Sequence, residues 1–212
     1  MDKNYVKDLE NFVKKMITPL KDLSFGMIIK IISDCRVLPF SKYPKLINLL
    51  KKVFKQTTLE INRKGIKSTR PNEVGNKIEP FVKKSLNQFN LQADTPANKN
   101  GKRISTGYPD IIFQHKKSFY YLECKTYNLK NKETTQRSFY FSPSNNFKIT
   151  KDAPHLMVSF EVEKRGKYYF VNYWKLFSLE KMRVDLKHEF NQSNKKMYAD
   201  DSCLDLIVEG RA

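Results

Sequence analysis

The chain has 212 residues, and its 40 lysines and arginines against 22 aspartates and glutamates give a formal net charge of +18. Hydrophobic residues make up 40% of the sequence and aromatic residues 13%, which excludes a disordered basic tail. A chain of this length buries roughly 70% of its unfolded surface, enough for one sizeable core. With only 7 glycines and 9 prolines, collagen-like and linker-rich architectures are excluded as well.

The cysteines and the apolar stretches restrict the class of protein further. Cys35, Cys124 and Cys203 lie far apart, so the sequence offers neither a disulfide framework nor a cysteine-clustered zinc or iron–sulfur site. The first ten residues lack the apolar core of a signal peptide, and the most apolar stretch, FGMIIKIIS, is too short to span a bilayer. We therefore expect a reduced, cytoplasmic protein with no membrane partner. Its positive charge favours a nucleic acid partner, the alternative being the lysine bias of an AT-rich genome.

Hydrophobic residues recur every three or four positions in the N-terminal third, which predicts helices. The helix of the first stripe, residues 5–20, should end or kink at Thr18-Pro19, and its apolar face should pack into the core or into a dimer. Further helical stretches are predicted at residues 23–32, in a short helix after Ser41, and at residues 71–90.

From Pro109 onwards the period changes to two, which is typical of strands. Residues 109–115 and 118–127 are predicted to form one hairpin, and residues 156–163 and 168–174 a second. A final helix from Ser178 to Phe190 and a last strand at residues 203–208 complete the prediction. The economical interpretation is one α/β domain over residues 1–212, with a mainly helical part at 1–70 and a core at 71–212.

The informative motif is Pro109-Asp110 followed, after twelve intervening residues, by Glu123-Cys124-Lys125. Strand alternation puts Glu123 and Lys125 on one face and directs Cys124 to the other, as a small core residue. If the hairpin turns at Lys116-Lys117, paired residue numbers sum to 233, and Asp110 falls opposite Glu123 at about 5 Å. Two carboxylates and one ammonium group should therefore converge at the open end of one hairpin.

This cluster suits a hard cation. Mg²⁺ prefers a few carboxylate oxygens and can bridge to a phosphate, which it polarises. Lys125 would help to position water or to stabilise charge on the phosphorus. The alternative is an exposed structural ion pair, but like charges placed opposite each other destabilise strands, so a bound cation is the better explanation.

Pro109-Asp110 and Glu123-Cys124-Lys125, on a hairpin that follows an acidic helix, resemble the motif of the PD-(D/E)xK nuclease superfamily. At this size and basicity the chain is most similar to its type II restriction endonucleases. The resemblance implies a mixed central β-sheet flanked by helices and Mg²⁺-dependent hydrolysis of double-stranded DNA. It also implies a homodimer and a companion methyltransferase in a bacterium or archaeon. Asp110 and Glu123 would be metal ligands, and Lys125 the catalytic lysine.

Members of the superfamily often add a glutamate from the preceding helix, and this sequence has two candidates. Glu79 borders the buried stripe of residues 71–90, whereas Glu73 lies with lysines on the solvated side. We expect Glu79 to join the site, although either residue could be a surface charge. No ATP-binding loop or histidine metal site is indicated.

Base recognition needs polar side chains that reach base edges. The polar segments offer as candidates Lys102, Arg103, Gln136, Arg137, Asn145, Asn146 and Lys148, each of which could instead contact phosphate or solvent. Two other functions stay open: a structure-selective repair or recombination nuclease of the same superfamily, and a basic DNA-binding domain without catalysis.

Overall fold

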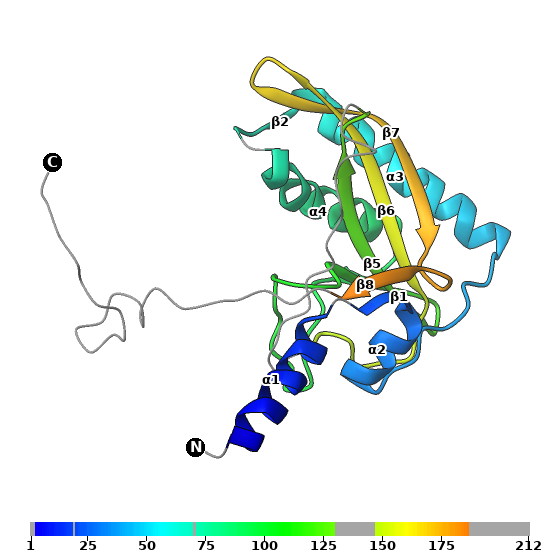
Figure 1. The fold of residues 1–212 in the computed structure, drawn as a ribbon. Coiled ribbons are helices and arrows are strands. Elements are labelled where there is room, and N and C mark those ends of the chain that lie inside the picture. The colour runs from blue at the N-terminus through cyan, green and yellow to red at the C-terminus, as the bar shows by residue number, and fades with distance from the viewer. Residues whose placement is uncertain (1–2, 19, 70, 130–146, 187–212) are drawn as a thin grey trace, which may run out of the picture. The chain divides into compact units, whose positions relative to one another are not determined.

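The computed structural model describes residues 3–18, 20–69, 71–129 and 147–186, and it divides into two compact units. The larger unit is Ser24–Arg183, and the smaller combines Met1–Leu23 with Val184–Ala212 (Figure 1). In the part of the chain that is described, no helix has the length and apolar character needed to cross a membrane.

The smaller unit contains helix α1, Lys3–Ile17, and a two-stranded sheet of β1, Leu20–Ser24, and β8, Arg183–Leu186. The predicted first helix is therefore confirmed, and it ends just before Thr18-Pro19 as expected. In the described part of the chain six side chains of its apolar stripe are exposed: Tyr5, Val6, Leu9, Phe12, Val13 and Met16. The stripe is therefore an exposed apolar face of α1 within the described residues.

The predicted helix from Ser178 to Phe190 is wrong over its described part. The Ser178 hydroxyl does accept a hydrogen bond from the Glu180 N–H at 3.3 Å, but a turn follows and residues 183–186 form β8. Exposed and half-buried residues alternate along β8, so its period of two overrides the capping signal. The predicted strand at residues 203–208 lies outside the described residues.

The larger unit is built on a six-stranded sheet in the order β2-β7-β6-β5-β4-β3. Its strands are β2, Ile66–Lys67; β3, Ala93–Asp94; β4, Ile111–His115; β5, Ser118–Tyr127; β6, His155–Arg165; and β7, Tyr168–Ser178. The β5–β6 pair is parallel and the other pairs are antiparallel. Both predicted hairpins are confirmed, as is the mixed sheet flanked by helices.

Three helices accompany this sheet: α2, Phe25–Ser33; α3, Pro44–Lys64; and α4, Pro71–Gln88. α3 has 21 residues and is longer than the short helix predicted after Ser41, while α4 accommodates Pro80 within its length. Apolar side chains of α3 and α4 form one core with alternate residues of the central strands, among them Leu122, Cys124, Val158 and Phe160. Cys124 is thus the small core residue predicted from the sequence.

The register of β4 against β5 fixes the geometry of the hairpin that carries the acidic motif. Ile111 pairs with Leu122 and His115 with Ser118, so paired residue numbers sum to 233 as predicted. Asp110 directly precedes the first paired residue of β4, which puts it next in register, opposite Glu123. The alternation of β5 directs Glu123 and Lys125 away from the apolar face that carries Leu122 and Cys124.

Candidate active site

One pocket of the larger unit brings the four predicted catalytic residues together. Its wall is made by α4, by the loop before β4 and by β5, and its lining residues are Asn76, Glu79, Ser105, Thr106, Gly107, Tyr108, Asp110, Glu123 and Lys125. Figure 1 shows α4 beside β5, the two elements from which three of the four charged residues come. The pocket is therefore assembled from segments that are up to about fifty residues apart in the sequence.

Asp110 is held in place by the backbone of the neighbouring strand. Its Oδ2 accepts a hydrogen bond from the Cys124 N–H at 2.7 Å, across the position where the β4–β5 ladder would continue. Burial raises the pKa of this carboxyl, while the bond from Cys124 and the Lys125 ammonium act in the opposite direction. The ladder geometry therefore fixes the carboxylate beside Glu123.

Glu123 is 3% exposed and has one satisfied and one unsatisfied oxygen. Lys125 Nζ donates to Glu123 Oε1 at 2.5 Å, whereas the buried Oε2 has no hydrogen-bond partner among the described residues. Burial, followed by repulsion from Asp110, raises the pKa of Glu123 to about 7 despite the Lys125 ammonium. The buried Oε2 therefore lacks the positive partner that an ionised carboxylate needs.

Glu79 reaches the same pocket from α4, and Glu73 does not. Burial and then the charges of Asp110 and Glu123 raise the pKa of Glu79 to about 7. Glu73 instead accepts a hydrogen bond from Ser68 Oγ at 2.9 Å, and Lys77 Nζ lies 3.8 Å from the same Oε2. Of the two helix glutamates, Glu79 is thus the one that the fold brings to Asp110 and Glu123.

A second lysine belongs to the electrostatic surroundings of the site. Lys148, which the sequence indicates as a base-contacting candidate, is only 3% exposed, and its Nζ has no hydrogen-bond partner in the described part of the chain. Burial lowers its pKa, and the charges of Asp110, Glu123 and Glu79 act to raise it. Its burial does not suit contact with bases; the ammonium group acts as a buried counter-charge to the three carboxylates.

Tyr108, two residues before Asp110 in the chain, lines the same pocket and packs against the buried ring of His155. Tyr108 Oη and His155 Nδ1 are 2.6 Å apart, and the two rings stack with an interplanar angle of 17°. Burial lowers the pKa of His155 to about 3, so the imidazole is neutral and has a packing role, as the sequence suggested. Sequence reasoning missed Tyr108, although its position directly before Pro109-Asp110 was a signal.

The remaining base-contacting candidates are spread over different surroundings. Lys102 is exposed, and Arg103 forms an ion pair with Asp94. The other candidates, Gln136, Arg137, Asn145 and Asn146, lie outside the described residues. Sequence reasoning also missed the hydroxyls of Ser105 and Thr106, which line the pocket a few residues after the basic loop.

The donor set of the pocket fits a hard divalent cation. Among the described residues no group of three or more histidine, cysteine, aspartate or glutamate side chains is placed so that it could hold a metal ion. The buried Oε2 of Glu123 nevertheless lacks a partner, and the carboxylates of Asp110 and Glu79 share its pocket. Carboxylate oxygens are the ligands that Mg²⁺ prefers, and it completes its shell with water.

Comparison with known proteins identifies the family. The model of the type II restriction enzyme MjaV family matches residues 19–201. The chain belongs to this family. It is 38% identical, over 220 aligned positions, to the type II restriction enzyme MjaV of Methanocaldococcus jannaschii, and the match covers 94% of this chain and 95% of the relative. The resemblance to type II restriction endonucleases inferred from the motif is therefore confirmed.

Proposed function

We propose that this member of the family is a sequence-specific endonuclease that hydrolyses phosphodiester bonds of double-stranded DNA with Mg²⁺. The observation that carries the proposal is the convergence of Glu79, Asp110, Glu123 and Lys125 on one pocket. The family of the relative, a type II restriction enzyme, supports the reaction class. The formal charge of +18 supports DNA as the partner.

In this proposal each residue of the pocket has a separate task. Asp110 and Glu123 would hold the metal, which when bound would polarise the scissile phosphate and lower the pKa of a bound water. Lys125, held by Glu123 at 2.5 Å, would stabilise charge that develops on the phosphate oxygens. The Cys124 N–H keeps Asp110 in register, and Glu79 contributes a third carboxylate from the helix side.

We further propose that residues 1–212 act as one nuclease domain that works as a cytoplasmic homodimer with a companion methyltransferase. The exposed apolar stripe of α1 supports the dimer, because an unpartnered amphipathic face of this kind is typical of an interface. A symmetric dimer would present two pockets to the two strands of a palindromic site. Sedimentation of the purified protein with Leu9→Lys in α1 tests this surface, since the substitution should yield monomers.

The function itself is tested by incubating the protein with long, unmethylated phage DNA, with and without Mg²⁺. We expect discrete Mg²⁺-dependent fragments whose mapped ends give the recognition site. The nearly isosteric Asp110→Asn should abolish cleavage while DNA binding in Ca²⁺ is kept. Asp152→Asn is the control, because Asp152 pairs with Arg36 at 2.8 Å away from the pocket lining.

Each other result refutes the proposal in a distinct way. A smear or nicking would replace it with the structure-selective nuclease. Intact DNA combined with Mg²⁺-insensitive binding would replace it with the non-catalytic DNA-binding domain. Retained cleavage by Asp110→Asn would refute the site even if the reaction is as proposed.

A further inference from the structure

Lysines and an arginine gather at the end of the β6–β7 hairpin, which we call the tip surface. It consists of Lys64, Lys67, Lys164, Arg165 and Lys167, all exposed. Backbone pairing holds the two stretches together: Lys67 pairs with Tyr168 across β2 and β7, and the Ser68 N–H donates to the Lys167 carbonyl at 3.4 Å. The tip surface is therefore one patch formed by two stretches of the chain, residues 64–67 and 164–167.

The charges of the tip surface are largely uncompensated. Within the described residues, the four lysines form no ion pair, and Arg165 alone is paired, with Glu163 at 2.7 Å. Like charges that are held together repel one another, so the binding of an anion to a surface of this kind lowers its free energy. Its exposed aromatic residue, Tyr168, is 41% exposed among these cations and can offer its hydroxyl to the same ligand.

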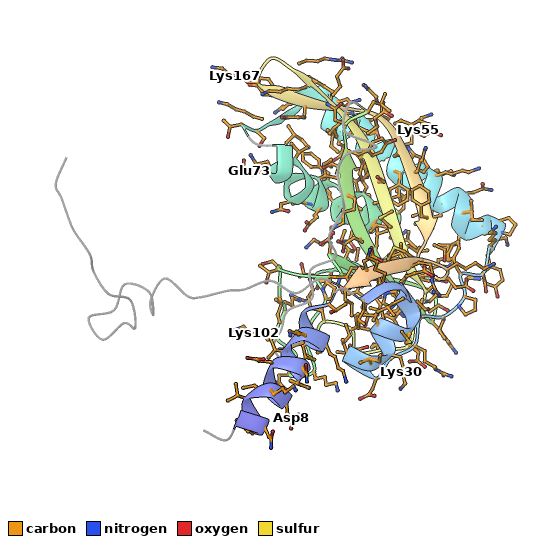
Figure 2. The ribbon with its side chains drawn as sticks, viewed as in Figure 1. Asp8, Lys30, Lys55, Glu73, Lys102 and Lys167 are labelled. Atoms are coloured by element: carbon orange, nitrogen blue, oxygen red, sulfur yellow. The ribbon has the colours of Figure 1, made fainter. Side chains whose placement is uncertain are left out.

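The tip surface adjoins the pocket through α4. Lys77 Nζ donates to the Lys67 carbonyl at 2.9 Å, and the residue before it, Asn76, lines the pocket. Figure 2 shows Lys167 and Glu73, in the first turn of α4, at the same end of the larger unit, while Lys55 on α3 lies apart from both. A ligand that leaves the pocket along the first turns of α4 therefore meets the tip surface.

The strands give the length of this path. Lys125 is in register with Ser159 on β6, and Arg165 lies six residues further along the same strand. At about 3.3 Å per residue this is roughly 20 Å. Because duplex DNA rises about 3.4 Å per base pair, the tip surface lies about six base pairs from a phosphate held at Lys125.

We propose that the tip surface binds backbone phosphates of the DNA duplex about six base pairs from the bond that is cut. The inference rests on the proposed endonuclease function and adds a contact surface outside the pocket. Backbone contacts of this kind carry no sequence information, but they increase affinity and fix the register of the duplex at the pocket.

Two variants with the same loss of charge test the proposal. Lys67→Gln, Lys164→Gln and Lys167→Gln are combined in one protein, and Lys51→Gln, Lys52→Gln and Lys55→Gln, on exposed positions of α3, in the control. Binding of each to a duplex is measured in Ca²⁺ over a range of salt. The tip variant should bind about 10- to 100-fold more weakly near physiological salt. The slope of its logarithmic binding constant against the logarithm of the salt concentration should be about 2 to 3 less steep than that of the wild type. The α3 variant should stay within about twofold of the wild type.

Duplex length gives a second readout on the mapped cleavage site. The wild type should bind duplexes that extend about ten base pairs beyond the cut more tightly than those that extend about three, and the tip variant should not distinguish them. Equal losses of duplex affinity in the tip and α3 variants, or no loss in either, would overturn the proposal. The lysines of the tip surface would then serve only to prevent other strands from pairing with the edge of the sheet. The failure is separable from that of the endonuclease proposal, which the wild type decides by fragmenting phage DNA.

Discussion

Replacing Glu123 by glutamine should stabilise the metal-free protein above neutral pH and abolish cleavage. Glutamine keeps the shape of the side chain and an oxygen that can accept the bond from Lys125 Nζ, but it removes the negative charge. The native carboxyl is buried beside Asp110, and its pKa is raised to about 7 from an ordinary value of 4.5. Ionising this carboxyl therefore costs more free energy in the folded protein than in the unfolded chain.

The size of this effect follows from the pKa values. Below pH 4.5 the carboxyl is protonated in both the folded and the unfolded chain, so its ionisation does not affect the free energy of unfolding. As the pH rises from 4.5 to about 7 the free energy of unfolding falls by about 3 kcal/mol, because each pKa unit corresponds to about 1.36 kcal/mol. Glu123→Gln removes this loss, which corresponds to a melting temperature about 6 to 12 °C higher for a protein of this size.

Thermal unfolding in EDTA at pH 8 and pH 5 measures the prediction, with cleavage of phage DNA in Mg²⁺ as the second readout. The control is Glu60→Gln, since a hydrogen bond from Lys84 first, and one from Gln56 second, lowers the pKa of Glu60. Neutralising Glu60 should therefore not stabilise the protein at pH 8. A melting temperature of Glu123→Gln that equals the wild type at pH 8, or an equal gain at pH 5, would refute the electrostatic reasoning.

Three further variants test separate parts of the structure. Lys125→Met should reduce the cleavage rate at least about 100-fold in a single-turnover assay while Ca²⁺-supported DNA binding persists, and near wild-type turnover would contradict its role. Glu79→Gln should reduce cleavage more than Glu73→Gln, and the reverse order would show that the other helix glutamate serves the site. Gly65→Ala should lower stability by about 1 to 3 kcal/mol in denaturant unfolding, because φ is +69° and a Cβ would lie 2.9 Å from side-chain atoms of β7. Gly166→Ala should lower stability less, because φ is +61° there as well but no atom lies within 4 Å of the added Cβ. Equal losses of stability in the two variants would show that the contacts of the Cβ at position 65 have no effect.

The hairpin that carries Asp110 and Glu123 was predictable because its information is local. A period of two on both sides of Lys116-Lys117 leaves one short turn, and the turn fixes every pair of the ladder up to Ile111 and Leu122. The same alternation assigns Cys124 to the core. The position of the acidic pair follows from neighbours within about fifteen residues, so no tertiary information was needed.

The same local reasoning failed where the partner of a segment decides its structure. Residues 183–186 have a hydroxyl cap ahead of them, but β1 pairs with them and they become a strand. The stripe of α1 shows that a period of 3.6 predicts a helix without telling what the apolar face touches. Periodicity reports the geometry of an element, whereas its packing depends on residues that lie far away in the sequence.

Lys148 shows the same limit inside the site and explains its charge balance. It lies in a polar stretch well beyond the motif, and nothing in its local pattern predicts that it is buried near Asp110, Glu123 and Glu79. Together with Lys125 it places two basic side chains beside three acidic ones, and burial raises the pKa of two of these acids, Glu79 and Glu123, to about 7. A divalent cation bound among these carboxyls would favour their ionised forms, because its charge offsets their mutual repulsion. The metal binding that we propose would therefore depend on a charge balance that the tertiary fold creates and the local sequence pattern does not reveal.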